Sequence, residues 1–166
     1  MEKKNNLEEA VGLEIERKFL VVHNQWPRHQ PGIYFKQGYI STHKTGVVRV
    51  RVAGKKAFLT VKGENKGSSR LEFEYQIPVQ EAEVMLRELC RKPLIEKTRY
   101  SIKYRGKTWE IDEFHGENRG LIIAEVELES PEEVFLKPPW AAEDVTGDSR
   151  YFNSNLCSAP FCSWPS

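Results

Sequence analysis

The 166-residue chain lacks any long apolar run and carries a net charge of only +1. A membrane-spanning helix needs about 20 consecutive apolar residues, and no stretch of the sequence approaches that length. The opening stretch MEKKNNLEEA also lacks the apolar segment of a secretion signal. The balanced charge excludes the overall basic field typical of proteins that bind nucleic acid or membrane surfaces, so neither partner is expected. These absences predict a cytoplasmic protein.

The chain is also poor in cysteine and histidine. Its three cysteines, Cys90, Cys157 and Cys162, are too few and too irregularly spaced for a secreted disulfide scaffold. The C-x4-C pair near the end of the chain would need two further soft ligands to hold zinc, and the four histidines are dispersed. We therefore expect free thiols and no zinc centre, with Cys90 as a small core residue on a helix.

No feature of the sequence marks a boundary between domains. There is no internal repeat, low-complexity linker or long run of like charge. A chain of 166 residues is long enough to bury a core without a metal or a disulfide framework. We expect a single domain over residues 1–166, with a flexible C-terminal tail.

Most of the chain alternates apolar and polar residues between turn-rich stretches such as KTG, AGKK and GENKGSSR. This alternation is typical of antiparallel strands, so the predicted fold class is α+β and mainly antiparallel β. About eight strands are expected, the number at which a sheet can close into a small barrel. Their predicted ranges are 12–22, 33–41, 46–53, 56–62, 70–79, 94–104, 107–114 and 120–129.

A few short helices are expected around the sheet. The stretch VQEAEVMLRELC has apolar residues at helical spacing, which predicts an amphipathic helix over residues 80–91 that covers apolar sheet surface. In SPEEVFLKPPW, Ser130 as N-cap and the proline after it predict a short helix that ends before Pro138, with Trp140 docking on the core. A last short helix is expected over residues 153–157.

The polar positions of the predicted strands are almost entirely charged. In GLEIERKFLV, residues 12–21, apolar residues alternate with two glutamates and a lysine. Because successive side chains of a strand point to opposite faces, one face of the sheet would be apolar and the other ionic. The ionic face would carry seven bases (Lys18, Arg49, Arg51, Lys62, Arg70, Lys97, Arg99) and eight acids (Glu14, Glu16, Glu72, Glu74, Glu110, Asp112, Glu125, Glu127).

Two interpretations of this ionic face compete. An ordinary antiparallel sheet with one face in water explains the alternation in any single strand. Faces in water normally mix charges with Ser, Thr, Asn and Gln, whereas here like charges recur two positions apart, about 7 Å from each other, where they repel. If the ionic face instead lines the inside of a barrel, the arginines and lysines suit phosphate oxygens. The carboxylates, with no Cys or His ligands nearby, suit Mg²⁺ or Mn²⁺.

Seven short motifs occur in a fixed order between about residues 12 and 156: Glu14-x-Glu16-x-Lys18, Arg49-x-Arg51, FLTVKG, RLEFEYQIP, EKTRY, WEIDEF and AEVELE. This ordered set resembles the CYTH superfamily of triphosphate tunnel metalloenzymes, and is most similar to its small bacterial members that hydrolyse inorganic triphosphate. The resemblance implies a closed antiparallel tunnel that holds a triphosphate end to end. It further implies metal-dependent hydrolysis of the triphosphate to pyrophosphate and phosphate.

The resemblance also implies roles for individual residues. Lys97, assisted by Arg99, becomes the candidate that positions or activates the attacking water, with Tyr39 lining the site. Glu72, Glu74 and Glu110 are left open between metal binding and salt bridges to neighbouring arginines. The implied metal ligands are Glu14, Glu16, Glu125 and Glu127, with Asp112 as a further contributor, and the implied substrate-binding bases are Lys18, Arg49, Arg51, Lys62, Arg70, Lys97 and Arg99.

Several alternatives stay open at this stage. The same scaffold supports adenylate cyclases and thiamine or nucleoside triphosphatases, which share the triphosphate grip. A non-catalytic module that binds polyphosphate would use the same bases, although it gains nothing obvious from so many acids near its ligand. The sequence also leaves the oligomeric state open between a monomer and a homodimer, and the segment around Arg150, Tyr151 and Asn153 is expected to plug or brace one mouth of the tunnel.

Overall fold

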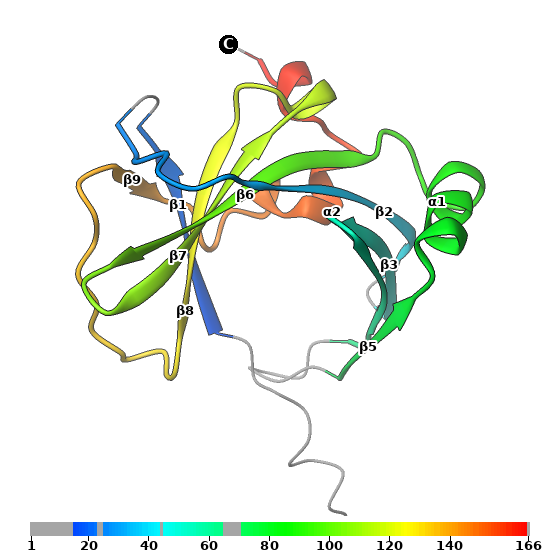
Figure 1. The fold of residues 1–166 in the computed structure, drawn as a ribbon, viewed down its shortest axis with the longest axis horizontal. Helices are drawn as coiled ribbons and strands as arrows, with labels where there is room; N and C mark the ends of the chain where they lie inside the picture. Colours follow the sequence, from blue (N-terminus) through cyan, green and yellow to red (C-terminus); the bar gives the residue numbers. More distant parts are fainter. Residues whose placement is uncertain (1–14, 23–24, 44, 65–70, 166) are drawn as a thin grey trace, which may run out of the picture.

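A computed structural model of the chain describes residues 15–22, 25–43, 45–64 and 71–165, and its centre is one antiparallel nine-stranded sheet (Figure 1). The order of the strands is β5-β4-β3-β2-β6-β7-β8-β1-β9. The strands are β1 (Ile15–Val21), β2 (Ile33–His43), β3 (Gly46–Ala53), β4 (Lys56–Lys62), β5 (Glu72–Ile77), β6 (Ile95–Tyr104), β7 (Lys107–Phe114), β8 (Ile122–Leu128) and β9 (Ala141–Asp144).

The eight predicted strands are confirmed over their described residues, β9 is a ninth strand that the sequence did not predict, and the sheet is curled. Residues 12–14 and 70 of the predicted ranges lie outside the described residues. Figure 1 shows the sheet bending around a central space, with β5 and β1 on opposite sides. Within the described ranges the hydrogen-bonded order ends at β5 on one side and β9 on the other. The fold is therefore the expected mainly antiparallel tunnel, with the difference that these hydrogen bonds do not close it into a ring.

The helices agree with expectation in two of three places. The amphipathic helix is α1 (Val79–Glu88), and the final short helix is α2 (Asn153–Leu156). The described part of the chain also contains the 3-10 turns η2 (Gly116–Asn118), η3 (Ser149–Tyr151) and η4 (Phe161–Ser163). No helix in the described part of the chain is both long enough and apolar enough to cross a membrane.

The prediction of a helix between Ser130 and Pro138 is wrong. The chain makes one turn, in which the Glu133 N–H donates to the Ser130 carbonyl at 3.1 Å, and then runs on without helix. Phe135 packs against the rings of Phe19 and Trp109, at centroid distances of 6.1 and 5.8 Å. A helix this short gains few hydrogen bonds for its nucleation cost, so the aromatic contacts decide the path of the segment.

The apolar face of the sheet points outward and is covered in two places. On one side, α1 packs Ala82 and Leu86 against Val50 and Val52 of β3. Cys90 joins this core as predicted, but it lies two residues beyond the end of the helix and not on it. On the other side, a cluster around Trp109 and Trp140 is completed by the chain after β8, and Trp140 is buried there as predicted. Because both coverings lie outside the curl, the ionic face is left to line its inside.

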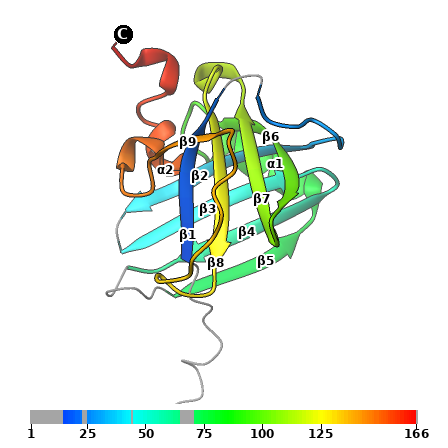
Figure 2. The same cartoon turned by 90° about the vertical axis from the view of Figure 1, so that its left-hand side faces the viewer.

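The C-terminal residues cover one end of the curled sheet. We call residues 149–157 the closing segment; Figure 2 shows its helix α2 beside one end of the strands. Leu156 and Cys157 pack there with Tyr39, Ile95 and other apolar residues of the inner face. The tail that follows, expected to be flexible, lies against η2, where the Phe161 N–H donates to the Asn118 side-chain oxygen at 2.8 Å.

Replacing Leu86 by Ala tests whether α1 is anchored through its buried face. Leu86 is fully buried, so Leu86→Ala should lower the free energy of unfolding by about 2–5 kcal/mol. Leu89→Ala is the matched control, because Leu89 is 59% exposed at the end of the same helix and its loss should cost less than about 0.5 kcal/mol. Urea unfolding of both variants makes the comparison; equal losses would contradict this packing.

Candidate active site

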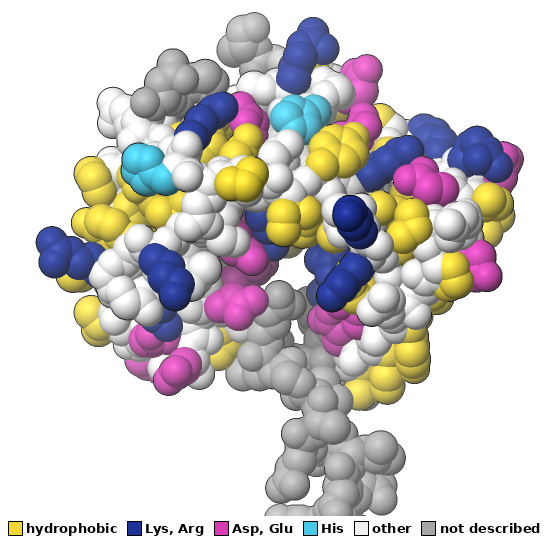
Figure 3. Space-filling view, in the orientation of Figure 1, with side chains coloured by type: hydrophobic (Ala, Val, Ile, Leu, Met, Phe, Trp, Pro, Cys, Tyr) yellow, Lys and Arg dark blue, Asp and Glu magenta, His cyan; other side chains and the backbone are white. Residues whose placement is uncertain are grey.

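The ionic face encloses one cavity of about 810 Å³ inside the curled sheet. In Figure 3 the opening lies at the middle of the molecule, with acidic and basic side chains around it. This placement excludes the ordinary sheet with a solvent-facing ionic surface. Six bases and six acids line the cavity: Lys18, Arg49, Arg51, Lys62, Lys97, Arg99, Glu16, Glu72, Glu74, Glu110, Glu125 and Glu127.

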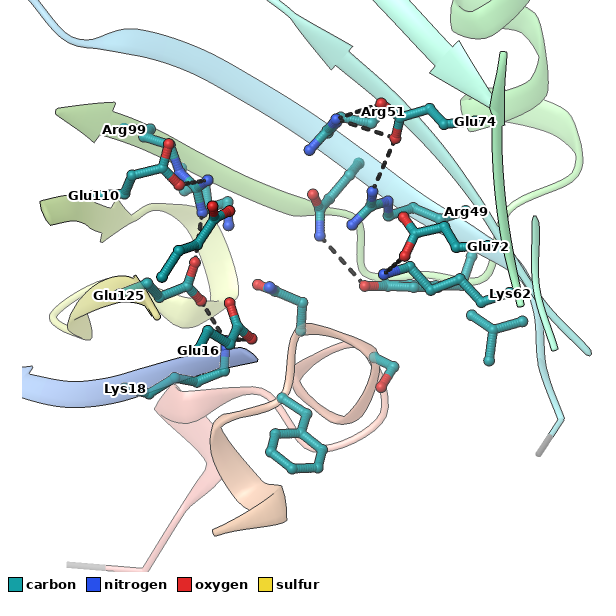
Figure 4. Close-up of a pocket in the computed structure, with 18 of the residues that line it drawn as sticks. Glu16, Lys18, Arg49, Arg51, Lys62, Glu72, Glu74, Arg99, Glu110 and Glu125 are labelled. Carbon is teal, nitrogen blue, oxygen red and sulfur yellow. Dashed lines mark hydrogen bonds and ion pairs between the residues drawn. The ribbon is translucent and has the colours of Figure 1, made fainter. Parts of the chain in front are cut away.

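Lys18 stands between two carboxylates on the wall formed by β1 and β8 (Figure 4). Its ammonium contacts Glu16 at 2.7 Å and also forms an ion pair with Glu125, which lies directly opposite Lys18 in the strand pairing. Burial works against the charge of Lys18, but Glu125 and Glu16 outweigh it and raise the pKa of this lysine above its ordinary value. Lys18 is therefore a fixed positive charge.

Arg99 of β6 links three acids on neighbouring strands. Its guanidinium donates twice to Asp112, at 2.7 Å each, once to Glu125 at 2.9 Å, and also pairs with Glu110. Burial would weaken its charge, but Asp112, Glu125 and Glu110 raise the pKa of Arg99 above its ordinary value. This one side chain therefore offsets part of the negative charge on β7 and β8, where Glu110 and Glu125 are direct partners in the strand pairing.

Lys97 and Asp112 form a buried ion pair beneath the wall of the cavity. Lys97 donates to Asp112 at 2.6 Å, and the two side chains are 2% and 0% exposed. Burial alone would raise the pKa of Asp112, yet Lys97 and Arg99 bring it down to about 2. Burial lowers the pKa of Lys97, while the contact with Asp112 acts in the opposite direction.

The opposite wall carries the arginines of β3 under weaker restraint. Glu74 accepts from Arg49 and Arg51 at 3.3–3.4 Å, and its firmest contact is the Thr60 hydroxyl at 2.8 Å. The Nε–H groups of both arginines are buried with no hydrogen-bond partner. A buried donor left unpaired is costly, so these groups favour an anion with several oxygens as their partner. Nearby, Lys62 contacts Glu72 at 2.9 Å.

Tyr39 lies where the ionic surface meets the closing segment. It is 5% exposed, its hydroxyl accepts from the Gln37 amide at 3.4 Å, and it packs with Leu156. Burial raises the pKa of Tyr39 to about 12, so its hydroxyl stays protonated at neutral pH. Tyr39 therefore lines the cavity as predicted, as a neutral hydrogen-bonding group.

Four of the six acids that line the cavity lie on β1, β7 and β8, and we call this side the acidic wall. The acidic wall fits a hard divalent cation shared with a phosphate ligand. Among the described side chains, no cluster of three or more His, Cys, Asp or Glu could hold a metal alone. Glu16 lies directly opposite Glu127, however, and the repulsion between these like charges is offset in part by Lys18, which contacts Glu16 at 2.7 Å, and would be offset further by a divalent cation. Magnesium is commonly bound by one or two carboxylates together with substrate phosphates, and two of the three carboxylates Glu16, Glu125 and Glu127 would suffice for such a donor set.

The structure places the predicted site residues unevenly. Glu14 and Arg70 lie outside the described residues. Asp112 is brought to the site but does not line the cavity, because it lies under Lys97 and Arg99. The remaining predicted bases, metal ligands and Tyr39 all line the one cavity.

Two further lining residues, Gln37 and Thr108, were not predicted. Thr108 shares the inner face of β7 with Glu110, whereas Gln37 comes to the site through its pairing with Arg51. Phe152, Asn153 and Ser154 enter the cavity from the closing segment, which was expected to plug or brace one mouth of the tunnel. The side-chain oxygen of Asn153 is buried there without a hydrogen-bond partner.

Replacing Asp112 by Asn tests the buried ion pair. Asp112→Asn leaves two buried cations short of their carboxylate, so the free energy of unfolding should fall by about 3–5 kcal/mol at neutral pH. The folded pKa of about 2 lies below the unfolded value of 3.8, so Asp112 contributes its full stability above about pH 4 and loses it as the pH falls to about 2. The difference in free energy of unfolding between wild type and Asp112→Asn should therefore become smaller as the pH falls from about 4 to about 2.

Urea unfolding at a series of pH values measures this difference. Asp148→Asn serves as the control, because the ion pair of Asp148 with Arg150 lies at the surface and its loss should change stability little. A difference that stays constant from neutral pH down to about pH 2 would contradict the assignment.

Comparison with known proteins agrees with this geometry. The family model described as the CYTH domain matches residues 12–155. An inorganic triphosphatase of Acetivibrio thermocellus is 52% identical over 151 residues, which are 91% of this chain and 97% of that protein. An inorganic triphosphatase of Nitrosomonas europaea is 40% identical over 148 residues, 86% of this chain and 95% of that protein.

A solved structure points the same way. The crystal structure of an inorganic triphosphatase superposes on this one with a TM-score of 0.67 at 36% identity, covering 92% of this chain and 97% of that one. The family match spans far more than half of the sequence, and each of the motifs that first suggested the family contributes at least one charged side chain to the lining of the cavity. The chain therefore belongs to the CYTH family.

Proposed function

We propose that this protein hydrolyses inorganic triphosphate to pyrophosphate and phosphate with the help of Mg²⁺ or Mn²⁺, in the cytoplasm. One observation carries the proposal: across one cavity, four glutamates of β1, β7 and β8 face the three bases of β3 and β4. A triphosphate chain that bridges these two sets of side chains would use both, since its oxygens can bind the arginines and lysines while sharing a divalent ion with the carboxylates. Relatives at 52% and 40% identity are named inorganic triphosphatases, which supports the proposal.

The substrate would be held by the bases of the cavity. We assign this role to Arg49 and Arg51 first, because their contacts with Glu74 are long and their Nε–H groups have no partner. Lys18, Lys62, Lys97 and Arg99 would complete the grip, and Arg70 is proposed with them from its motif. Phosphoryl transfer needs in-line positioning and neutralised charge, and a set of fixed cations supplies both without a covalent intermediate.

The metal would be held by Glu16, Glu125 and Glu127, with Glu14 proposed from its motif. A divalent ion bound there would neutralise charge on the phosphates and orient water. We propose a different role for Asp112. Its two oxygens already accept from Lys97 and Arg99, so it holds these bases in place instead of binding metal directly.

Lys97 is the proposed base for the attacking water, with Arg99 beside it. A lysine accepts a proton only when it is neutral. Burial lowers the pKa of Lys97 and so favours its neutral form, although Asp112 acts in the opposite direction. Glu72 and Glu74 we assign to holding Lys62 and the two β3 arginines, since these are the contacts they make. In this arrangement the two glutamates reduce the repulsion among Arg49, Arg51 and Lys62 until phosphate oxygens replace them as partners.

A substrate panel tests the reaction itself. With Mg²⁺ or Mn²⁺, inorganic triphosphate should yield equal amounts of phosphate and pyrophosphate, and should be turned over faster than ATP or thiamine triphosphate. No turnover should occur with excess chelator. Faster formation of cyclic AMP from ATP would replace the proposal with a cyclase, and tight triphosphate binding without any turnover would replace it with a binding module.

Replacing Glu16 by Gln tests the metal assignment. Glu16→Gln keeps the size of the side chain but removes its charge, so metal-dependent kcat/KM should fall at least about a hundredfold while the urea midpoint stays close to that of wild type. Glu143→Gln on β9 is the matched control, because this glutamate is exposed and does not line the cavity. Unchanged activity of the Glu16 variant would refute its role as a metal ligand.

A further inference from the structure

Phe35 of β2 is surrounded by three of the cavity's bases. It is 9% exposed and lies directly opposite Lys97 in the pairing of β2 with β6. The centre of its ring is 5.3 Å from the Arg99 guanidinium carbon, 5.6 Å from that of Arg51 and 6.0 Å from the Lys97 ammonium nitrogen. These are distances at which a cation is attracted to the electron-rich face of an aromatic ring.

We propose that Phe35 is a positioning residue for triphosphate: its ring holds Arg51, Arg99 and Lys97 at the places where they contact the substrate. This inference deepens the proposed function and rests on it for the identity of the anion. Phe35 itself is absent from the lining of the cavity, so it acts through the three bases and not by touching the substrate.

The three bases come from both sides of Phe35. Arg51 belongs to β3, while Lys97 and Arg99 belong to β6, and β2 is the strand between them. Each base is also paired with an acid, but with acids on different strands: Glu74 for Arg51, and Asp112 for Lys97 and Arg99. Phe35 is therefore the contact that the two groups of bases share.

A neutral ring stabilises these cations in a way that a carboxylate cannot. A carboxylate occupies N–H donors, which are then lost to the phosphate, and its negative charge repels the substrate. A ring attracts the cation through its π face and leaves the N–H donors free to bind oxygens. An aromatic side chain beside Arg51 and Arg99 therefore keeps their guanidinium groups ordered while their N–H donors stay available.

Two other rings mark the special position of Phe35. Phe58 lies 5.4 Å from Arg51, and Phe114 lies 5.5 Å from Lys97. Each contacts one base, so Arg51 and Lys97 each lie near two rings. Among the described aromatic residues, Phe35 is the one recorded near all three bases, which is why the test is placed there.

Fluorination of the Phe35 ring separates the cation contact from simple packing. Added fluorines draw electron density from the π face, whereas they change the ring's size little. Phenylalanines with increasing numbers of ring fluorines, placed at position 35, should weaken binding of triphosphate step by step, reaching roughly tenfold for the fully fluorinated ring. The dissociation constant is measured by calorimetry in metal-free buffer, and kcat and KM are measured with Mg²⁺.

The same series at Phe135 is the matched control. Phe135 packs against Phe19 and Trp109 in the outer cluster, and no cation contact of its ring is recorded among the described residues. Its fluorination should leave triphosphate binding unchanged. Phe35→Leu, which keeps an apolar side chain but no ring, should weaken binding about as much as full fluorination of Phe35, and the urea midpoints of the fluorinated proteins should match wild type.

The outcomes separate this inference from the proposed function. Binding that does not respond to fluorination, together with a loss in Phe35→Leu, would show that Phe35 only fills space and would overturn the inference. A graded loss of binding supports it, even if the wild-type protein proves to bind triphosphate without hydrolysing it. Binding without hydrolysis would contradict the proposed function and would leave the role of Phe35 intact.

Discussion

The structure depends on placing like charges close together without letting them repel. Six lysine and arginine side chains line one cavity, and each of them has a carboxylate neighbour. The neighbour lies on the same or an adjacent strand, except for Arg49 and Arg51, whose partner Glu74 lies two strands away on β5. Arg99 shows the principle most clearly, because it bridges Asp112, Glu110 and Glu125 on two neighbouring strands. Without this alternation of sign, the interior would be too unfavourable electrostatically for the sheet to curl around it.

The inward ionic surface also explains the outer architecture. A sheet must bury its apolar face, and here that face is on the outside of the curl, so it needs α1 over β3 and the aromatic cluster around Trp109 on the other side. The usual arrangement, with an apolar filling inside a small barrel, is thereby reversed. At one end of the curled sheet, the closing segment adds apolar packing to the inner face, where Leu156 and Tyr39 belong to the same buried cluster.

The sequence was most informative where a two-residue period continued over a whole strand. The range expected for β7 coincides with the observed strand, and β6 differs by one residue, because side chains on both faces follow the alternation. It was uninformative for β9, a four-residue strand that forms through contact with β1 and has no period of its own. The Ser130 helix failed for a related reason, since its capping signal was local while the contacts of Phe135 are distant in the sequence.

For the site, alternation predicted which face a residue occupies but not how deep it lies. Asp112 and Glu110 stand two residues apart on the same face, yet Asp112 is fully buried and Glu110 is 40% exposed at its side chain. The difference arises from strand register, which puts Asp112 directly opposite Arg99 and Glu110 opposite Ser101. Phe35 went unnoticed for the same reason, because only the pairing of β2 with β6 brings its ring to Lys97.

The unequal strength of the ion pairs on the two walls indicates how an anion would enter. Lys97 is held at 2.6 Å by a carboxylate with no access to water, whereas Arg51 meets Glu74 at 3.3 Å or more near the cavity surface. Exchanging a carboxylate for a phosphate oxygen costs less where the first contact is long and partly hydrated. Arg51 would therefore exchange Glu74 for phosphate oxygens on binding. The Lys97–Asp112 ion pair would stay in place and fix the position of Lys97 relative to the reacting phosphate.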